Sequence, residues 1–341
     1  MTDMIQMIKN TAKWLVGQVG PHRWPGTNGG IIVLAYHRVL PESDPRYALE
    51  QPPLCITPET FNRHLNWLKQ KGFTLVQLSD WLKGNVADAA NLKCCAITFD
   101  DGWVDNYEFA YPILKDNKAP ATIFCVSSML AGRSNYWPGR LVQLINECLK
   151  HPLPDYQNRE EMAWLRRCTK DAKIDWTNPL RPDFDRLIES CKVYSDADIH
   201  RHIDDTISAL NLSYTEPRQV LTKDQIQEMT SSGLIEIGSH TINHTRLSVS
   251  TPEHILHDEI INSRKVLESE FNTPIEIFCY PNGYAPESAQ KYVGEAYLAG
   301  CGLYKGWNFK SENNSFMARI SLHESNSKYQ YQFMSRLSGL L

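Results

Sequence analysis

Two adjacent carboxylates, Asp100 and Asp101, follow an apolar segment from Cys94 to Phe99 and come directly before Gly102. The apolar segment predicts a buried strand that ends at these polar residues. Neighbouring side chains in a strand point to opposite faces, so both carboxylates can serve one site only if the chain bends, and we expect Gly102 to supply the bend. One carboxylate could then bind a metal ion while the other moves a proton. The alternative is that Asp-Asp-Gly only ends the strand and caps a helix beginning near Asn106.

Two histidines, His240 and His244, follow another predicted strand with three residues between them. If the chain coils there, both imidazoles lie on one face and can reach a single ion. Alone, this spacing on an exposed helix is more often incidental than functional. Combined with a carboxylate from another strand end, it predicts a two-histidine, one-carboxylate metal site with open positions for water and substrate.

The elements that position these residues are strands that alternate with helices along most of the chain. Such alternation predicts a parallel sheet, and the chain length fits a closed (β/α) barrel of seven or eight parallel strands. In such barrels the chemistry gathers at the C-terminal ends of the strands. The polar residues at predicted strand ends are His37, Asp100, Asp101, His240 and Tyr280.

Two segments do not follow this alternation. Residues 1–18 predict an amphipathic helix, with a Gly- and Pro-rich linker completing an N-terminal part over 1–30. The barrel is expected over 31–341, interrupted at about 133–220 by a polar, helical insertion without strand-like segments. The insertion could also be only packing material.

Composition narrows the classes of function and the compartment. A net charge of −4 gives no electrostatic reason to expect a nucleic-acid partner. Nine cysteines, several of them inside apolar strand-like segments, favour a reducing compartment. With no visible signal peptide or membrane-spanning segment, we expect a cytoplasmic protein. Packing of the helix over 1–18 on the barrel is favoured over peripheral contact with the inner face of the membrane. The oligomeric state is left open.

Three motifs resemble the signature of the polysaccharide deacetylases, the NodB homology domain of carbohydrate esterase family 4. In chain order they are Thr98-Phe99-Asp100-Asp101-Gly102, His240-Thr241-Ile242-Asn243-His244 and Phe278-Cys279-Tyr280-Pro281-Asn282-Gly283. The resemblance covers roughly 31–132 and 221–322, so that the N-terminal helix and the insertion lie outside it. It implies a distorted β/α barrel that removes acetyl groups from N-acetylated amino sugars with one divalent ion, zinc ahead of cobalt or nickel.

The resemblance also implies a role for each matching residue. Asp100 matches the catalytic base, and Asp101, His240 and His244 match the metal ligands. Tyr280 and Pro281 match a wall of the substrate groove, where the backbone N–H of Asn282 would help to hold the oxyanion. The metal would polarise the acetamide carbonyl and activate a water, from which Asp100 takes the proton. Trp103, Tyr136, Trp137, Tyr284 and Trp307 could stack on sugar rings, but as a group they are as well explained as core or loop anchors.

A general acid must protonate the leaving amine, and two histidines are candidates. His323 in Ile-Ser-Leu-His resembles the usual late family motif, whereas Tyr36-His37 resembles the branch that deacetylates poly-N-acetylglucosamine, in which the motif order is rotated. We favour His37 on the pattern of motifs. The usual family arginine before the third motif is absent, since Ile275 stands there, and Arg319 is the substitute that we suggest; the alternative is that Arg319 is only a surface charge.

Together these features predict a metal-dependent deacetylase of an amino sugar in a bacterial polysaccharide or glycolipid precursor. The alternatives are a hydrolase of a non-sugar amide and an inactive carbohydrate-binding protein of the same fold. Retention of Asp100 argues against the binding protein, because binding does not require the base.

Overall fold

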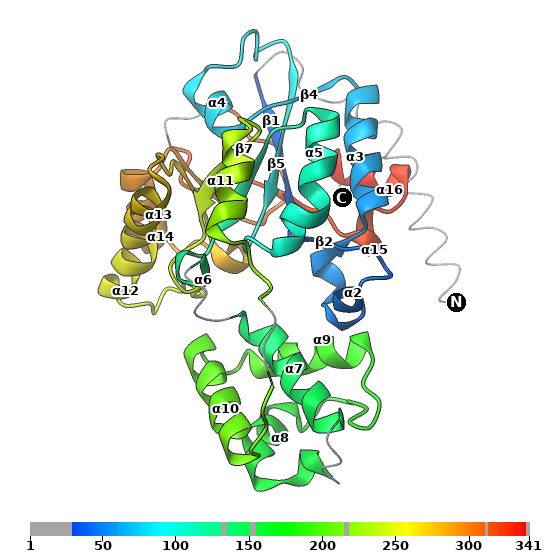
Figure 1. Cartoon of the computed structure of the whole chain (residues 1–341). Helices are drawn as coiled ribbons and strands as arrows, with labels where there is room; N and C mark the ends of the chain where they lie inside the picture. The colour runs from blue at the N-terminus through cyan, green and yellow to red at the C-terminus, as the bar shows by residue number, and fades with distance from the viewer. Residues whose placement is uncertain (1–28, 131–134, 151–154, 215–217, 311–312, 339–341) are drawn as a thin grey trace.

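The computed structural model describes residues 29–130, 135–150, 155–214, 218–310 and 313–338 (Figure 1). The amphipathic helix expected over 1–18, with its proposed membrane contact, lies outside the described residues, as does nearly all of the linker. Among the described residues, no helix combines the length and the apolar composition that crossing a bilayer requires.

Eight parallel strands form the main sheet, in the order β10-β1-β5-β6-β7-β8-β9, with β4 paired to β5 beside this path. Parallel strands need crossover connections, which helices mostly supply here. The strands are β1 (Ile31–Tyr36), β4 (Phe73–Leu75), β5 (Lys93–Phe99), β6 (Ala121–Cys125), β7 (Ile235–Ser239), β8 (Ile277–Cys279), β9 (Ala299–Cys301) and β10 (Ile320–Ser321).

One segment of the chain joins the two edges of this sheet. Met317 accepts a hydrogen bond from the N–H of Gly302 at the end of β9 (2.9 Å) and donates one to the carbonyl of Gly300 (2.7 Å). A little further on, Ser321 in β10 pairs with Ala35 of β1. The sheet therefore curls back on itself, which confirms the predicted distorted barrel.

The side chains of each strand alternate between the barrel interior and the outer helices. In β5, Cys94 and Ala96 belong to an interior cluster, whereas Ile97 and Phe99 pack with the helices outside. Because both faces of the sheet are covered, β1 is apolar and buried along its whole length. The inward-facing set of β5 ends at the strand's C-terminus, where Asp100 follows.

Helices surround the barrel, and two of the longer ones contain a π-helical turn. The helix expected to begin near Asn106 is η3 (Asn106–Ala110, a π turn) followed by α5 (Tyr111–Asn117). The other consists of α12 (Glu253–His257), η6 (Asp258–Asn262, a π turn) and α13 (Ser263–Phe271). The other helices of this layer are α3 (Pro58–Gln70), α4 (Leu78–Lys83), α6 (Ser127–Leu130), α11 (Lys223–Ser231), α14 (Glu287–Ala296), α15 (Glu324–Ser327) and α16 (Gln330–Leu337).

Short elements follow several strand ends. The chain after β1 forms β2 (Arg38–Val39), α2 (Pro45–Leu49), the 3-10 turn η2 (Pro52–Leu54) and β3 (Cys55–Ile56), with β2 and β3 paired in parallel. A further 3-10 turn, η7 (Pro281–Gly283), follows β8.

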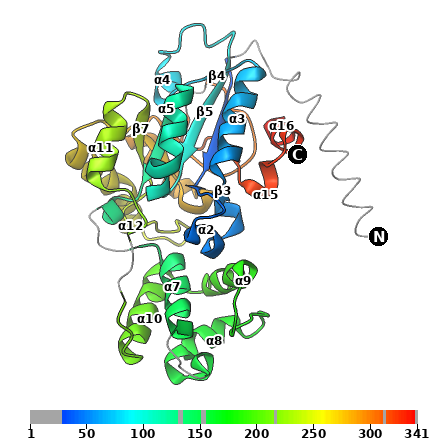
Figure 2. The same cartoon turned by 45° about the vertical axis from the view of Figure 1, so that its right-hand side comes forward.

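Four helices between β6 and β7 form a separate group: α7 (Trp137–Lys150), α8 (Ala163–Thr169), α9 (Arg181–Cys191) and α10 (Asp196–Ala209). Together with residues 135–136, which lead into α7, we call this group the insertion. The 3-10 turns η4 (Tyr156–Asn158) and η5 (Glu160–Met162) lie among them. Leu141, Leu165, Leu187 and Ile199 belong to a hydrophobic core that these helices share with one another. Figures 1 and 2 show the group beyond the edge of the barrel at which β1 leads into β2.

Candidate active site

The two adjacent aspartates leave β5 in different directions because the backbone turns at Asp101. Asp101 has φ 73° and Gly102 has φ 66°, so two consecutive residues are left-handed and the bend begins one residue earlier than expected. An L-residue with a side chain adopts this region only at a cost of about 1–2 kcal/mol. Asp100 thus keeps the inward orientation of β5, while the Asp101 side chain turns toward the end of β7.

Asp101, His240 and His244 converge at this point. The Oδ1 atom of Asp101 lies 3.4 Å from His240 Nε2 and 3.3 Å from His244 Nε2, and one ligand atom from each residue lies within 4.8 Å of the others. Oδ1 is buried and has no hydrogen-bond partner. Although burial raises the pKa of Asp101, the two imidazoles hold it well below its usual value.

The ring of His240 is oriented by a main-chain carbonyl. Its Nδ1 lies 2.8 Å from the carbonyl oxygen of Cys279, and because a carbonyl only accepts, Nδ1 must carry the proton. In a neutral ring, the lone pair of Nε2 then faces the unpartnered oxygen of Asp101. This is the tautomer and the kind of outer hydrogen bond found at metal-binding histidines, so the donor set fits a divalent cation.

The loop that carries the two histidines is held by Glu259 of η6. Its carboxylate accepts hydrogen bonds from the backbone N–H groups of Ile242 (2.8 Å) and Asn243 (3.0 Å), and from the side chains of Asn243 (2.9 Å) and Thr245 (2.8 Å). The loop is not helical, and His244 has φ 59°. This contact could not be predicted from the sequence, because Glu259 resembles any other acidic residue of an amphipathic helix.

Asp100 forms a buried, bidentate pair with Arg319. The two guanidinium nitrogens lie 2.6 and 2.8 Å from the carboxylate oxygens, and the same guanidinium also donates to Thr98 Oγ1 (3.0 Å). Although burial raises the pKa of Asp100, Arg319 holds it below its usual value, so this carboxylate stays ionised. Arg319 is only 1% exposed, so the alternative that it is a surface charge is wrong.

The two candidate acids have different surroundings. His37 follows β1, with Nε2 3.8 Å from Asp100 Oδ2, and lines the cavity described below. His323 lies outside that lining, and its Nδ1 is 2.8 Å from Ser325 Oγ. Burial lowers the pKa of His323 to about 4, which leaves it without a proton to donate near neutral pH.

The predicted substrate-binding residues do not all reach the cavity. Tyr280 is fully buried, its ring packs with the outer helices, and its hydroxyl donates to the carbonyl of Ser315 (2.6 Å). It points outward because it continues the outward-facing register of Phe278. Pro281 is buried as well and does not line the cavity, so the prediction of a wall formed by Tyr280 and Pro281 is corrected to Asn282 of the same turn.

Trp103 lies at the cavity and also contacts a proposed metal ligand. Its indole Nε1 donates to the Oδ2 atom of Asp101 (2.9 Å), and the Arg38 guanidinium lies over its ring at 4.2 Å. Only 5% of Trp103 is exposed. The residue therefore orients Asp101 in addition to lining the cavity.

A cavity of about 520 Å³ lies between the barrel and the insertion. Its barrel side includes His37, Asp100, Asp101, Trp103, His240 and His244. Its insertion side includes Tyr136, Trp137, Asp185, Ile188, Glu189 and Asp196. The insertion is therefore more than packing material, because it covers the strand ends at which the site residues lie.

The parallel strands curl into a barrel, and the cluster of Asp100, Asp101, His240 and His244 lies at their C-terminal ends. This arrangement agrees with the class of deacetylases that the three motifs resemble. The sequence model of the family described as polysaccharide deacetylase matches residues 87–158 and 195–299, together more than half of the chain. The chain therefore belongs to the polysaccharide deacetylase family. Residues 159–194, which include α8 and α9, fall between the two matched segments.

One curated relative carries the name of a polysaccharide deacetylase, the protein YxkH of Bacillus subtilis (strain 168). It is 24% identical over 239 residues, which are 70% of this chain and 54% of YxkH. The chain thus spans about half the length of this relative.

Several solved structures share the fold. Streptococcus pyogenes deacetylase PplD, in complex with acetate, has a TM-score of 0.59 at 17% identity, over 91% of this chain and 99% of that one. IcaB from Ammonifex degensii has a TM-score of 0.55 at 18% identity, over 90% and 97% of the two chains. The polysaccharide deacetylase BC0361 from Bacillus cereus has a TM-score of 0.55 at 17% identity, over 90% and 69%.

Proposed function

We propose that this protein removes the N-acetyl group from an amino sugar. The observation that carries the proposal is the convergence of Asp101, His240 and His244 beside the ionised carboxylate of Asp100, at the base of one cavity. Hydrolysis of an amide needs a polarised carbonyl, a base for the attacking water and an acid for the leaving nitrogen. The proposed metal ligands, Asp100 and the nearby His37 can meet these three requirements in turn.

Asp101, His240 and His244 would hold one divalent cation. Their fit rests on the unpartnered, buried Oδ1 of Asp101 and on the hydrogen bond that fixes the tautomer of His240. Two imidazoles and a carboxylate suit zinc, with cobalt or nickel as alternatives. When bound, such a cation polarises the acetamide carbonyl and makes water more acidic.

Different residues around the proposed metal site accept and donate the protons of the reaction. Asp100 takes the proton of the attacking water, because Arg319 keeps its carboxylate ionised and Asp100 lines the cavity. His37, whose Nε2 lies 3.8 Å from Asp100 Oδ2, gives a proton to the leaving amine as the C–N bond breaks. The backbone N–H of Asn282 is the donor that we assign to the oxyanion.

The cavity favours a short glycan or the terminal sugar of a longer one. Its volume lies within the range of about 300–1,000 Å³ of pockets that enclose a small ligand. The insertion is fixed on both sides of the cavity: Gln51 donates to Asp185 (2.8 Å), and Arg246 donates to the carbonyl of Tyr194 (2.7 Å). A polymer crossing the site would have to displace these contacts. We therefore infer an amino sugar at a chain end or in a glycolipid precursor.

We also infer a reducing, cytoplasmic location. All nine cysteines are free thiols, and eight of them are buried. Titration of thiols in protein unfolded without reductant should find nine; fewer would contradict this location.

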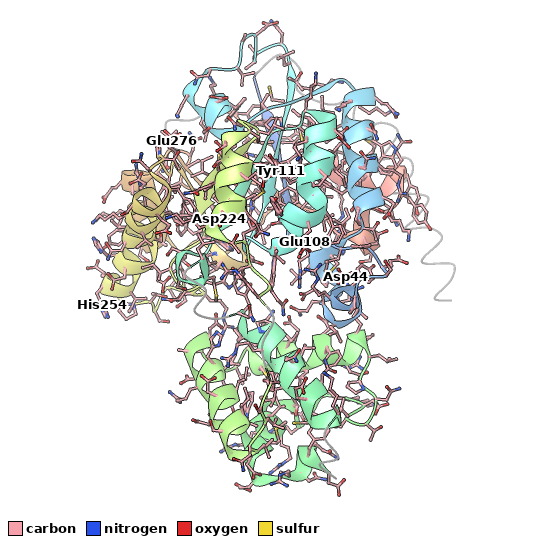
Figure 3. The ribbon with its side chains drawn as sticks, in the orientation of Figure 1. Asp44, Glu108, Tyr111, Asp224, His254 and Glu276 are labelled. Carbon is pink, nitrogen blue, oxygen red and sulfur yellow. The ribbon has the colours of Figure 1, made fainter. Side chains whose placement is uncertain are left out.

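Acetate release from defined N-acetylated sugars tests the proposed function. Protein loaded with zinc is incubated with N-acetylglucosamine, with its β-1,4-linked oligomers up to the hexamer, and with a lipid-linked N-acetylglucosamine. We expect acetate from at least one of them, with deacetylation at a terminal unit by mass spectrometry. Hydrolysis of a non-sugar acetamide alone, or none at all by a metal-loaded protein, would contradict the proposal. The matched protein control is Asp224→Asn on the outer helix α11 (Figure 3).

A further inference from the structure

We propose that Tyr136, which the insertion supplies, is a positioning residue for the metal ligand Asp101. The inference rests on the proposed function, because it assigns Tyr136 a role at the metal site of the same deacetylase. It goes further in making the metal site depend on the docked insertion.

The contact between Tyr136 and Asp101 is direct. The tyrosine hydroxyl donates to the main-chain carbonyl of Asp101 at 2.7 Å, and Tyr136 is only 5% exposed. Tyr136 comes immediately before α7, the first helix of the insertion.

Asp101 is a residue whose backbone needs such a contact. Its φ of 73° is left-handed, a region that residues other than glycine enter at a cost even where, as for Asp, it is tolerated, and this conformation turns the carboxylate toward the two histidines. The Tyr136 hydroxyl holds the main-chain carbonyl of Asp101 while Trp103 Nε1 holds its Oδ2 atom. Together these two hydrogen bonds fix both ends of the ligand.

The ring of Tyr136 fixes the neighbours of Asp101 as well. It packs edge-on against the ring of His244, with centroids 5.3 Å apart at 82°, and against Trp103 with centroids 4.8 Å apart. Tyr136 therefore contacts two of the three proposed ligands and the tryptophan that orients one of them. Loss of the hydroxyl alone should loosen Asp101 without removing the ring packing.

The insertion offers a matched control for this hydroxyl. Tyr156 also donates to a main-chain carbonyl, that of Trp176, at 2.8 Å, and it lies in the separate core of the insertion. Its ring is buried to a similar extent, at 4% exposed. The substitutions Tyr136→Phe and Tyr156→Phe thus remove the same group from the same kind of bond, only one of which reaches the metal site.

The test is the affinity of the chelator-stripped full-length protein for zinc, measured by competition with a chromogenic chelator. We expect Tyr136→Phe to bind zinc about tenfold more weakly than wild type, since outer partners of metal ligands typically contribute 10–100-fold. Tyr156→Phe should match wild type. Thermal unfolding of the metal-free proteins should show no larger loss for Tyr136→Phe than for Tyr156→Phe, which separates a positioning role from a general loss of stability.

Equal zinc affinity of wild type and Tyr136→Phe would overturn the inference and leave the proposed function standing. An equal loss in both variants would overturn it too, because the effect would then come from the insertion as a whole. Absence of zinc binding by wild type would instead remove the metal site itself. Acetate release by Tyr136→Phe should return to the wild-type rate at saturating zinc; failure to recover would show that the hydroxyl does not act through metal affinity.

Discussion

The end of the barrel and the insertion meet at one cavity but are built differently. At the barrel end, Asp101, Thr241 and His244 all have positive φ, and Asp100 and Arg319 are charged and buried. Such strained and desolvated residues persist only where the surroundings hold them, and they concentrate at functional sites. The insertion is made of ordinary helices around their own apolar core. We infer that the barrel carries the proposed chemistry, whereas the insertion covers the cavity and adds Tyr136 to it.

The largest effect should follow from Asp100→Asn. The amide keeps the shape of the side chain but cannot accept the proton of the attacking water, so turnover should fall by about 10²–10⁴-fold. Binding of zinc should persist, because Asp100 is not among the proposed ligands. Single-turnover acetate release measured at saturating zinc checks this, and a variant that kept more than about a hundredth of the rate would show that Asp100 is not the base.

Arg319→Met should be the most destabilising change at the barrel end. It leaves the Asp100 carboxylate buried without its partner, which typically costs about 3–5 kcal/mol of unfolding free energy. The double variant Asp100→Asn/Arg319→Met removes the charge and should recover part of that loss. Urea unfolding of the single and double variants measures the coupling, and additive losses would mean that the ion pair does not stabilise this end of the barrel.

The buried His64 predicts a dependence of stability on pH. Burial lowers its pKa from 6.5 to about 4, and in the fold Tyr36 OH lies 3.0 Å from Nδ1 and the carbonyl of Ser327 lies 2.8 Å from Nε2. Between these pH values the unfolded chain binds more protons, so stability is full above about pH 6.5 and falls by about 3 kcal/mol toward pH 4.

Replacing His64 by Gln should flatten that part of the curve of stability against pH. His254→Gln, on the outer helix α12, is the control (Figure 3). Urea titrations at pH 7, 6 and 5 provide the curve, and an unchanged slope in His64→Gln would assign the dependence to other groups.

The smallest effect should come from loosening the insertion. Arg181 of α9 donates to the carbonyl of Glu50 and lies over the ring of Tyr47 at 4.4 Å, outside the cavity. Arg181→Ala should cost about 1 kcal/mol of stability and raise acetate release from the hexamer relative to the monomer. Arg186→Ala is the matched control, since Arg186 donates to the carbonyl of Lys173 and to Asp183, both within the insertion. A ratio unchanged from wild type would contradict the role of the insertion in access.

The sequence predicted most of the barrel, because buried parallel strands are apolar throughout and polar residues mark where they end. It also suggested Arg319, and alternation supports that choice: Met317 faces the interior, so Arg319 does too. The same rule would have placed Tyr280 with the outward-facing Phe278 and excluded it from the cavity. The alternation of side chains along a strand depends only on local sequence, so it predicts which residues face the interior wherever a strand is recognised.

Contacts between distant segments could not be predicted in this way. Glu259 reaches the histidine loop from a π turn, and Tyr136 reaches Asp101 from the insertion. Neither residue belongs to a motif, and nothing in the local pattern distinguishes them from a solvated acid or a core aromatic. The left-handed conformation of Asp101 could not be predicted either, because Gly102 alone was enough to explain the expected bend.

The metal content of the purified protein tests the central claim most directly. Wild type, Asp101→Ala, His240→Ala and the control Asp224→Asn are each loaded with zinc, freed of excess and measured by atomic emission. We expect about one ion per chain in wild type and in Asp224→Asn, and none in the two ligand variants. A wild type that retains no zinc, cobalt or nickel, or an Asp101→Ala variant that retains a full ion, would contradict the proposed site.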